Sequence, residues 1–376
     1  MSEIKLWRLG VKTLVMVLIF NFLLTPVLVE PLGRLSIYNR LVPGRRRFPY
    51  GENPAQSYSL NTFDLEANLH SHQVAAISSE EQTFNVFIYG DSSTWGTLLK
   101  PGETLAGQLN ALSLSTGDER PVRVYNLGYP TMSLAKDLLF MEKTLSLEPD
   151  LILWLVTLES FPLDKQLDSP LVANNPELMG RIIKAYGLPL DVEDDQFVSQ
   201  DYWGQTLLEQ RRHLANLYRL QLYGVMWGIT GIDQYYPEEY ERAQRDLEDV
   251  STFKGWQEGD MTGEDLAYPL LEAGLEMAGE IPVLLINEPI LVSTGANSDL
   301  RYNFYYPRWA YDQYRAGLQE ISQENGWHYR DYWNLVPENE FTNTAVHLTP
   351  QGVGMLREQV TRDIIQILDS HFSGSN

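Results

Sequence analysis

The chain has 376 residues, of which 44% are hydrophobic and 21% charged, values typical of a folded globular protein and not of a disordered one. Acidic residues outnumber basic ones by 50 to 28, and the formal charge of -22 would repel a phosphate backbone, so we expect no nucleic-acid partner. The absence of cysteine excludes disulfides, thiolate nucleophiles and cysteine-ligated metal sites.

The first element in chain order is an apolar run from Val11 to Val29, VKTLVMVLIFNFLLTPVLV. It is just long enough to span a bilayer, and no small-residue cleavage site follows it, so residues 1–30 are predicted to form an uncleaved transmembrane anchor. The alternative is a core helix of a soluble protein, but such a helix normally has a polar face. The arginines that follow the run (Arg34, Arg40 and Arg45 to Arg47) favour a cytoplasmic body under the positive-inside rule.

Residues 31–80 are rich in Pro, Gly, Asn and Ser and are predicted to connect the anchor to the body, with a short helix near residues 65–77. From residue 81 to 376, strand and helix patterns alternate. Strands are predicted at 85–90, 122–128, 150–156, 281–289 and 327–336, and amphipathic helices at 101–113, 131–148 and 348–368. This alternation predicts an α/β fold with a doubly wound parallel sheet that helices cover on both faces.

An insertion of about 120 residues, at about 161–280, separates the third and fourth predicted strands, where one crossover helix would suffice. Its pattern is largely helical, and it is acidic and rich in Tyr and Trp. We consider two interpretations: a solvated helical subdomain, or a lid over the carboxyl edge of the sheet, where ligands bind in open α/β folds.

The first predicted strand ends in GDSSTWG, which places Asp91, Ser92 and Ser93 at the carboxyl edge of the sheet. A serine followed by a helix lies near amides that can stabilise an oxyanion. Serine alone is a weak nucleophile and needs a base from another part of the chain. A strand-to-helix turn with a capping serine is the structural alternative.

A candidate base is His347, which lies on a loop directly before the last predicted helix, where Thr349 and Pro350 form a helix start. A histidine at the edge of the sheet can reach a serine on the loop of another strand, and its pKa lies in the useful range. The structural alternative is a histidine that only packs.

These segments resemble the SGNH (GDSL) hydrolase family. The resemblance is carried by FIYGDSSTWG, NLGYPTMS and HLTPQG, which occur in the order and on the elements expected for that family. It implies a flavodoxin-like three-layer α/β/α fold that hydrolyses esters or transfers acyl groups. By this resemblance, Ser92 is the nucleophile, His347 is the general base, and the backbone amides of Ser92 and Gly128 form the oxyanion hole.

Two blocks depart from the family pattern. The family's Gly-x-Asn-Asp block supplies an asparagine to the oxyanion hole, whereas LWLVTLESF places Glu159 there, and a carboxylate facing an oxyanion is repulsive. The family's acid normally lies three residues before the histidine, and that position holds Thr344. The alternatives that could orient His347 are Asp331, Glu338, Glu340, the neutral Asn343, or a backbone carbonyl.

Further polar residues are candidates for the pocket. Asp91 lies beside the predicted nucleophile, and Asn287 and Glu288 end the fourth predicted strand at the same edge, although a turn before Pro289 explains the last two equally well. The segment from Arg301 to Arg315 is dense in aromatics, which either pack or form a wall for a sugar or acyl chain.

The sequence therefore predicts a single-pass membrane-anchored ester hydrolase or O-acyltransferase that acts on an acylated carbohydrate or lipid. The alternative is a catalytically inactive module that binds carbohydrate or partners at the membrane. We expect no cofactor and no metal, since no phosphate-binding loop, dinucleotide motif or metal-ligand spacing occurs. Despite the arginines, the family resemblance favours a body on the extracytoplasmic side.

Overall fold

Five parallel strands form one sheet in the computed structural model, in the order β2-β1-β3-β4-β5. The structure describes residues 6–24, 37–42, 65–69, 72–77, 82–198, 202–203, 206, 208, 211–232 and 235–373. The strands are β1 (Phe84–Tyr89), β2 (Val122–Asn126), β3 (Leu151–Val156), β4 (Val283–Asn287) and β5 (His328–Asp331). This order is flavodoxin-like, with the change in chain direction between β1 and β3. The predicted doubly wound parallel sheet is confirmed.

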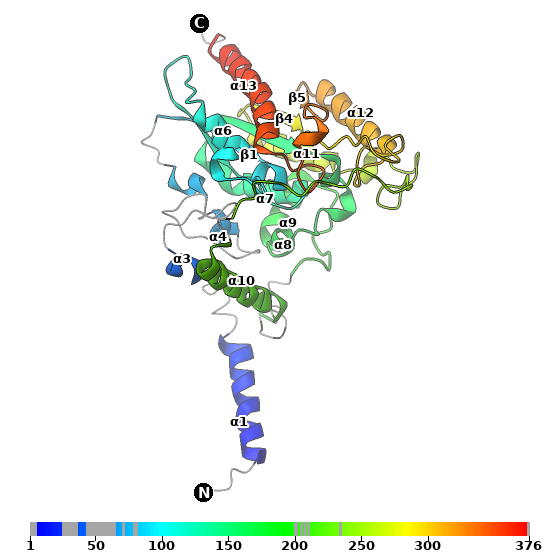
Figure 1. Ribbon diagram of the computed structural model, residues 1–376. Coiled ribbons are helices and arrows are strands. Elements are labelled where there is room, and N and C mark those ends of the chain that lie inside the picture. Colours follow the sequence, from blue (N-terminus) through cyan, green and yellow to red (C-terminus); the bar gives the residue numbers. More distant parts are fainter. Residues whose placement is uncertain are drawn as a thin grey trace.

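Helices cover both faces of the sheet, which gives three layers (Figure 1). Because side chains alternate along a strand, Phe87 and Tyr89 point to one face, and Val86 and Ile88 to the other. The first face is covered by α7 (Leu134–Thr144), α8 (Pro170–Ala173), α9 (Pro176–Tyr186), α11 (Tyr268–Ala278) and α12 (Arg308–Glu324). The second face is covered by α6 (Leu105–Ala111) and α13 (Pro350–Ser373).

The other helices are short or lie outside these layers. They are α1 (Leu6–Ile19), η1 (Phe20–Leu24), α3 (Ile37–Leu41), α4 (Leu65–Leu69), η2 (Gln73–Ala76), α5 (Ser92–Trp95), η3 (Pro101–Glu103), η4 (Leu145–Leu147), η5 (Leu158–Ser160), η6 (Leu163–Lys165), α10 (Arg211–Thr230), η8 (Gly263–Asp265) and η9 (Glu338–Glu340).

The insertion is less helical than its pattern predicts. Residues 161–280 contain α8 to α11, of which α11 serves as the crossover between β3 and β4. Residues 235–262 form no helix. Their backbone bonds instead to the loops after β4 and β5, through the amide of Ala243 to the carbonyl of Thr342 (2.6 Å) and the amide of Leu247 to the carbonyl of Ala296 (2.9 Å). This acidic stretch therefore runs along the carboxyl edge of the sheet as an irregular strap.

The N-terminal region is described only in part. The helix found there, α1, covers Leu6–Ile19, and residues 25–29 of the predicted span lie outside the described residues. Among the residues that the structure describes, no helix is long and apolar enough to cross a membrane. The predicted helix near residues 65–77 is present as two short pieces, α4 and η2, and most of the predicted connecting region lies outside the described residues.

Candidate functional site

The loop after β1 turns directly into the short helix α5, whose first residue is Ser92. The Asp91 side chain caps this helix, because its Oδ1 accepts a hydrogen bond from the amide of Ser93 at 2.7 Å. Gly128, after β2, lets this helix approach closely, since an added Cβ would lie 2.5 Å from the backbone nitrogen of Trp95. The Ser92 backbone is thereby held between the ends of β1 and β2.

The structure brings Ser92 and His347 together from positions 255 residues apart. Their Oγ and Nε2 atoms lie 2.8 Å from one another. The other ring nitrogen, Nδ1, lies 3.0 Å from Oδ1 of Asn343, and the amide of His347 donates to the hydroxyl of Thr344 at 3.1 Å. The family resemblance places an acid at position 344, which here holds a threonine whose hydroxyl fixes the loop. The His347 ring is oriented instead by Asn343, the residue before Thr344.

Asn343 determines which nitrogen of His347 carries the hydrogen. Its Oδ1 also accepts a hydrogen bond from the hydroxyl of Thr342 at 3.3 Å, which fits an oxygen at this position. An oxygen can only accept, so Nδ1 of His347 donates to it and Nε2 keeps its lone pair toward Ser92. Burial lowers the pKa of His347, and the carboxylate of Asp91 partly opposes this. The imidazole is therefore neutral and poised to accept a proton at neutral pH.

Gly128 and the amide of Ser92 were predicted to form an oxyanion hole. The amide of Gly128 donates to Oδ1 of Asn126 at 3.0 Å, and Nδ2 of Asn126 donates to the carbonyl of Thr94 at 2.9 Å. Asn126, which the sequence analysis did not single out, thus ties the end of β2 to α5. For the amide of Gly128 to donate to an oxyanion, its hydrogen bond to Oδ1 of Asn126 must be shared with the oxyanion or broken.

Beneath the serine lies a buried pair of carboxyl groups, Asp91 and Glu288. The hydroxyl of Ser93 donates to Oε2 of Glu288. Oδ2 of Asp91 and Oε1 of Glu288 are buried and receive no hydrogen bond from the described part of the chain. Burial raises the pKa of Glu288 well above its usual value, and the adjacent Asp91 raises it further. A Glu288 carboxyl that keeps its proton avoids a second buried negative charge in this pair.

A fully buried lysine supports this loop from the side of α7. The ammonium of Lys136 donates to the carbonyl of Gly90 at 2.7 Å and forms an ion pair with Asp137, whose other oxygen accepts from the indole of Trp154 at 3.0 Å. The sequence analysis treated this lysine as part of an amphipathic helix and missed it. The only available signal was a charged pair within an otherwise apolar stretch of the chain.

Glu159 lies in η5, just after β3, and its carboxylate has a partner. It forms an ion pair with Lys254 of the strap, which opposes the burial that raises the pKa of Glu159. Both residues line a cavity of about 360 Å³ together with Arg301, Phe304 and Tyr305. Burial raises the pKa of Tyr305, and the carboxylates of Glu159 and Asp91 raise it further, so this phenol lies within electrostatic range of the cavity wall and of the nucleophile loop.

Asn287 and Asp331 belong to a second polar cluster, which does not include His347. Nδ2 of Asn287 donates to Asp331 at 2.8 Å, and Arg315 of α12 donates to the other oxygen of Asp331 at 2.6 and 3.0 Å. Asp331 was a candidate to orient His347, and this interpretation is wrong because its oxygens are used by Asn287 and Arg315.

The other two acidic candidates for orienting His347 are also engaged elsewhere. Glu338 accepts from Thr294 at 2.7 Å and pairs with Arg245, while Glu340 accepts from the hydroxyl of Thr349. Among the described residues, no group of three or more His, Asp or Glu side chains could hold a metal ion.

Comparison with known proteins gives likenesses of structure only. No family model and no curated protein matches the sequence. Similar solved structures include a lipase/acylhydrolase from Enterococcus faecalis, with 15% identity, a TM-score of 0.37 and coverage of 75% of this chain and 95% of that one. Another is a catalytic mutant of an acetylxylan esterase from Geobacillus stearothermophilus, with 14% identity, a TM-score of 0.35 and coverage of 77% and 95%.

A third is a carbohydrate acetylesterase family member from Sinorhizobium meliloti, with 16% identity, a TM-score of 0.31 and coverage of 75% of this chain and 99% of that one. All three are described as lipases, acylhydrolases or acetylesterases. At such TM-scores the likeness carries no argument of its own, and the functional argument rests on the geometry of the serine site.

Proposed function

We propose that the chain is a serine ester hydrolase of the SGNH type, with Ser92 as nucleophile and His347 as general base. The observation that carries this proposal is the 2.8 Å contact between Oγ of Ser92 and Nε2 of His347, with Asn343 holding the opposite nitrogen of the ring. The resemblance of three sequence blocks to that family supports it.

In this proposal Ser92 attacks the ester carbonyl carbon while Nε2 of His347 takes the hydroxyl proton. The amides of Ser92 and Gly128 stabilise the oxyanion, and His347 returns the proton to the leaving alcohol as the carbonyl reforms. Water then releases the acyl group from Ser92, or a second hydroxyl accepts it, which would make the protein an O-acyltransferase. Asn343 cannot compensate the imidazolium with a full charge, so the nearby Asp91 carboxylate supplies the negative field.

The cavity beside Glu159 favours an acyl group carried by a neutral sugar over one carried by a lipid. Its charged lining residues are two acids, Glu159 and Glu248, and two bases, Lys254 and Arg301, so the wall has no net charge. Packing an alkyl chain against the Glu159–Lys254 pair would desolvate both charges without compensation. A sugar supplies hydroxyls instead, and Oε2 of Glu159 has no hydrogen-bond donor within the described residues.

A fluorophosphonate probe tests the nucleophile in the full-length chain. We expect the wild type and Ser93→Ala to be labelled and Ser92→Ala to remain unlabelled. Labelling that persists in Ser92→Ala, or an unlabelled wild type, would contradict the proposal, and the second outcome would favour the inactive binding module.

The sugar preference is tested by comparing kcat/KM for methyl 6-O-acetyl-glucopyranoside, which keeps free hydroxyls, with that for 4-nitrophenyl octanoate. We expect Lys254→Met to lower the ratio of the two values about tenfold, because a charge-assisted hydrogen bond contributes about 1.5–3 kcal/mol. Lys143→Met, which removes an ion pair with Glu66 instead, is the matched control. Equal losses on both esters would argue against a sugar in the cavity.

We further propose that residues 11–29 anchor the chain in a membrane, with the body on the extracytoplasmic side. The largely apolar run supports the anchor despite Lys12, Asn21 and Pro26. The exposed apolar side chains that α1 carries around its axis also support it (Val11, Leu14, Val15, Met16, Val17, Leu18 and Ile19). The family resemblance supports the side of the membrane. Protease added to intact cells should digest the body, and full protection would contradict the proposed orientation.

A further inference from the structure

Helix α10 carries an apolar row that no other described part of the chain covers. Its members are 57% to 78% exposed and recur every three or four residues: Tyr218, Leu222, Met226 and Ile229. This spacing places them along one side of the helix, which we call the outer face of α10. Single exposed apolar residues are common, but a continuous row of them usually marks an interaction surface.

The other side of α10 packs on α3: Gln221 and Gly224 are buried, and the ring of Trp227 meets that of Tyr38 edge to face, with centroids 6.2 Å apart. Gln221 is 5% exposed and accepts a hydrogen bond from the amide of Ile37, in α3, at 2.9 Å. Gly228 also faces α3, where an added Cβ would lie in ordinary contact with the side chain of Leu41, at 3.5 Å. A helix on the surface of a soluble domain normally leaves its polar side exposed. In α10 the exposed outer face is apolar as well.

The charge of α10 also differs from that of the rest of the chain. The helix contains Arg211, Arg212 and Arg219 and no acidic residue, whereas acidic residues outnumber basic ones by 50 to 28 overall. Arg211 and Arg219 are exposed on the side of the outer face. Apolar and aromatic residues flanked by arginines are typical of helices that lie in the headgroup region of a membrane.

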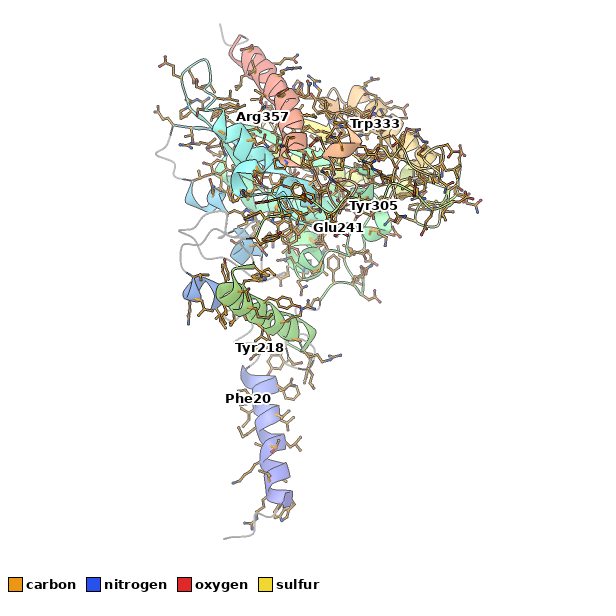
Figure 2. The ribbon with its side chains drawn as sticks, viewed as in Figure 1. Phe20, Tyr218, Glu241, Tyr305, Trp333 and Arg357 are labelled. Atoms are coloured by element: carbon orange, nitrogen blue, oxygen red, sulfur yellow. The ribbon has the colours of Figure 1, made fainter. Side chains whose placement is uncertain are left out.

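The segment before α10 contacts the end of the N-terminal helical region. The amide of Leu208 donates to Oδ1 of Asn21 at 3.0 Å, and the ring of Trp203 meets that of Phe22 edge to face, with centroids 5.5 Å apart. Trp203 is 63% exposed, and exposed tryptophans are enriched at membrane interfaces. Figure 1 shows α10 between α1 and the sheet. In Figure 2, Tyr218 of α10 and Phe20, the first residue of η1, are labelled in neighbouring parts of the view.

We propose that the outer face of α10 binds the surface of a lipid bilayer that contains anionic lipids, with the helix axis in the membrane plane. A second copy of the chain could also cover an apolar row. In a two-fold dimer of α10 on α10, however, no carboxylate of the partner helix would face the arginines, because α10 contains no acidic residue. A bilayer with anionic headgroups instead offers a negative charge for each arginine. The proposal does not depend on the chemistry of Ser92.

The chain has no native cysteine, so one introduced cysteine gives a single labelled position. We would attach the fluorophore NBD to Leu222→Cys or Ile229→Cys in the full-length protein, reconstituted in vesicles of phosphatidylcholine and phosphatidylglycerol. The control is Ile365→Cys, on an exposed apolar position of α13, which lies at the other end of the molecule (Figure 1). We expect blue-shifted emission and quenching by nitroxide-labelled lipid at positions 222 and 229, and neither at 365.

The arginines are tested by adding Arg211→Gln and Arg219→Gln to the labelled Leu222→Cys protein. We expect the quenching by lipid to weaken at least twofold, and high salt to weaken it in the parent protein. The proposal is overturned if positions 222 and 229 stay as unquenched as 365 on the vesicles, or if the protein does not associate with them. A blue shift that grows with protein concentration in detergent, without vesicles, would assign the face to a second copy.

Discussion

Two groups of buried polar side chains lie at the carboxyl edge of the same sheet, and they differ in whether their hydrogen bonds are complete. In the cluster at β4 and β5, Oδ1 of Asn287 accepts from the phenols of Tyr311 and Tyr314, both at 3.2 Å, while Arg315 and Asn287 occupy the oxygens of Asp331. Each of these five side chains has a hydrogen-bond partner within the protein, although the phenol of Tyr329 in β5 has none among the described residues. Such a closed network fixes a fold.

At the serine site after β1, by contrast, the hydrogen bonds of the buried polar groups are incomplete. Asp91 and Glu288 each keep one buried oxygen without a donor in the described chain, and the Ser92–His347 contact holds a proton that can move. Unsatisfied buried groups with displaced pKa values are costly to keep and tend to occur at functional sites. The difference between the clusters predicts that substitutions at β4 and β5 affect stability and that substitutions around Ser92 affect reactivity.

The largest expected effect comes from removing the base. His347→Ala should lower kcat for an aryl ester by about 10³–10⁴, because a positioned base contributes on this scale. His328→Ala, at an exposed histidine that begins β5, is the matched control and should leave kcat unchanged. If both variants lost activity equally, the loss would reflect the fold and not the reaction.

The closed cluster should respond in the opposite way. Asp331→Ala leaves Arg315 and Asn287 without their partner and should lower the free energy of unfolding by about 2 kcal/mol, with kcat of the folded protein unchanged. Urea denaturation and ester hydrolysis measure the two quantities. Glu358→Ala removes an exposed ion pair with Arg357, at 3.3 Å, and should cost less than about 0.5 kcal/mol. A fall in kcat of Asp331→Ala would place this cluster in the active site.

The sequence was sufficient to predict the sheet and the meeting of Ser92 with His347. Fully apolar strands identify a parallel sheet, and the ends of its strands and the starts of its helices converge on one edge. The residue that orients His347 could not be chosen from the sequence. Asn343 takes that role because the Thr344 hydroxyl binds the amide of His347 and turns the loop, and such a local turn leaves no periodic signal.

Lys136, Asn126 and the strap at 235–262 were missed for related reasons. A lysine within a helix reads as a solvated residue unless its buried partners are known, and those partners, Gly90 and Asp137, converge only in the folded chain. The strap bonds to loops far away in sequence, so its acidic, helix-like composition was a poor guide. Long-range partners determined these features, and local propensity did not.

The carboxyl pair should make stability depend on pH. The pKa of Glu288 is raised in the folded state, so the unfolded chain loses the Glu288 proton first, as pH rises above about 4.3. Above that pH the free energy of unfolding of the wild type therefore falls. Glu288→Gln keeps the shape and cannot ionise. Its free energy of unfolding should therefore rise relative to wild type between pH 4.5 and pH 8. A constant difference across this range would show that Glu288 is ionised in the folded protein.

The smallest expected effect concerns the charge beside His347. Asn343→Asp places a carboxylate against Nδ1 and should raise the pKa of His347, which burial lowers in the native chain. Because the base must be neutral to accept a proton, the acidic limb of the kcat/KM profile should move to higher pH. At pH 8, where the base is neutral in both proteins, the carboxylate should raise kcat by less than about tenfold, since it stabilises the imidazolium of the transition state. Asn343→Ala should lower kcat at every pH. If the acidic limb stayed in place in Asn343→Asp, a group other than Asn343 would orient the His347 ring. The unsatisfied oxygens of Asp91 and Glu288 would then be the remaining difference between the serine site and the cluster at β4 and β5.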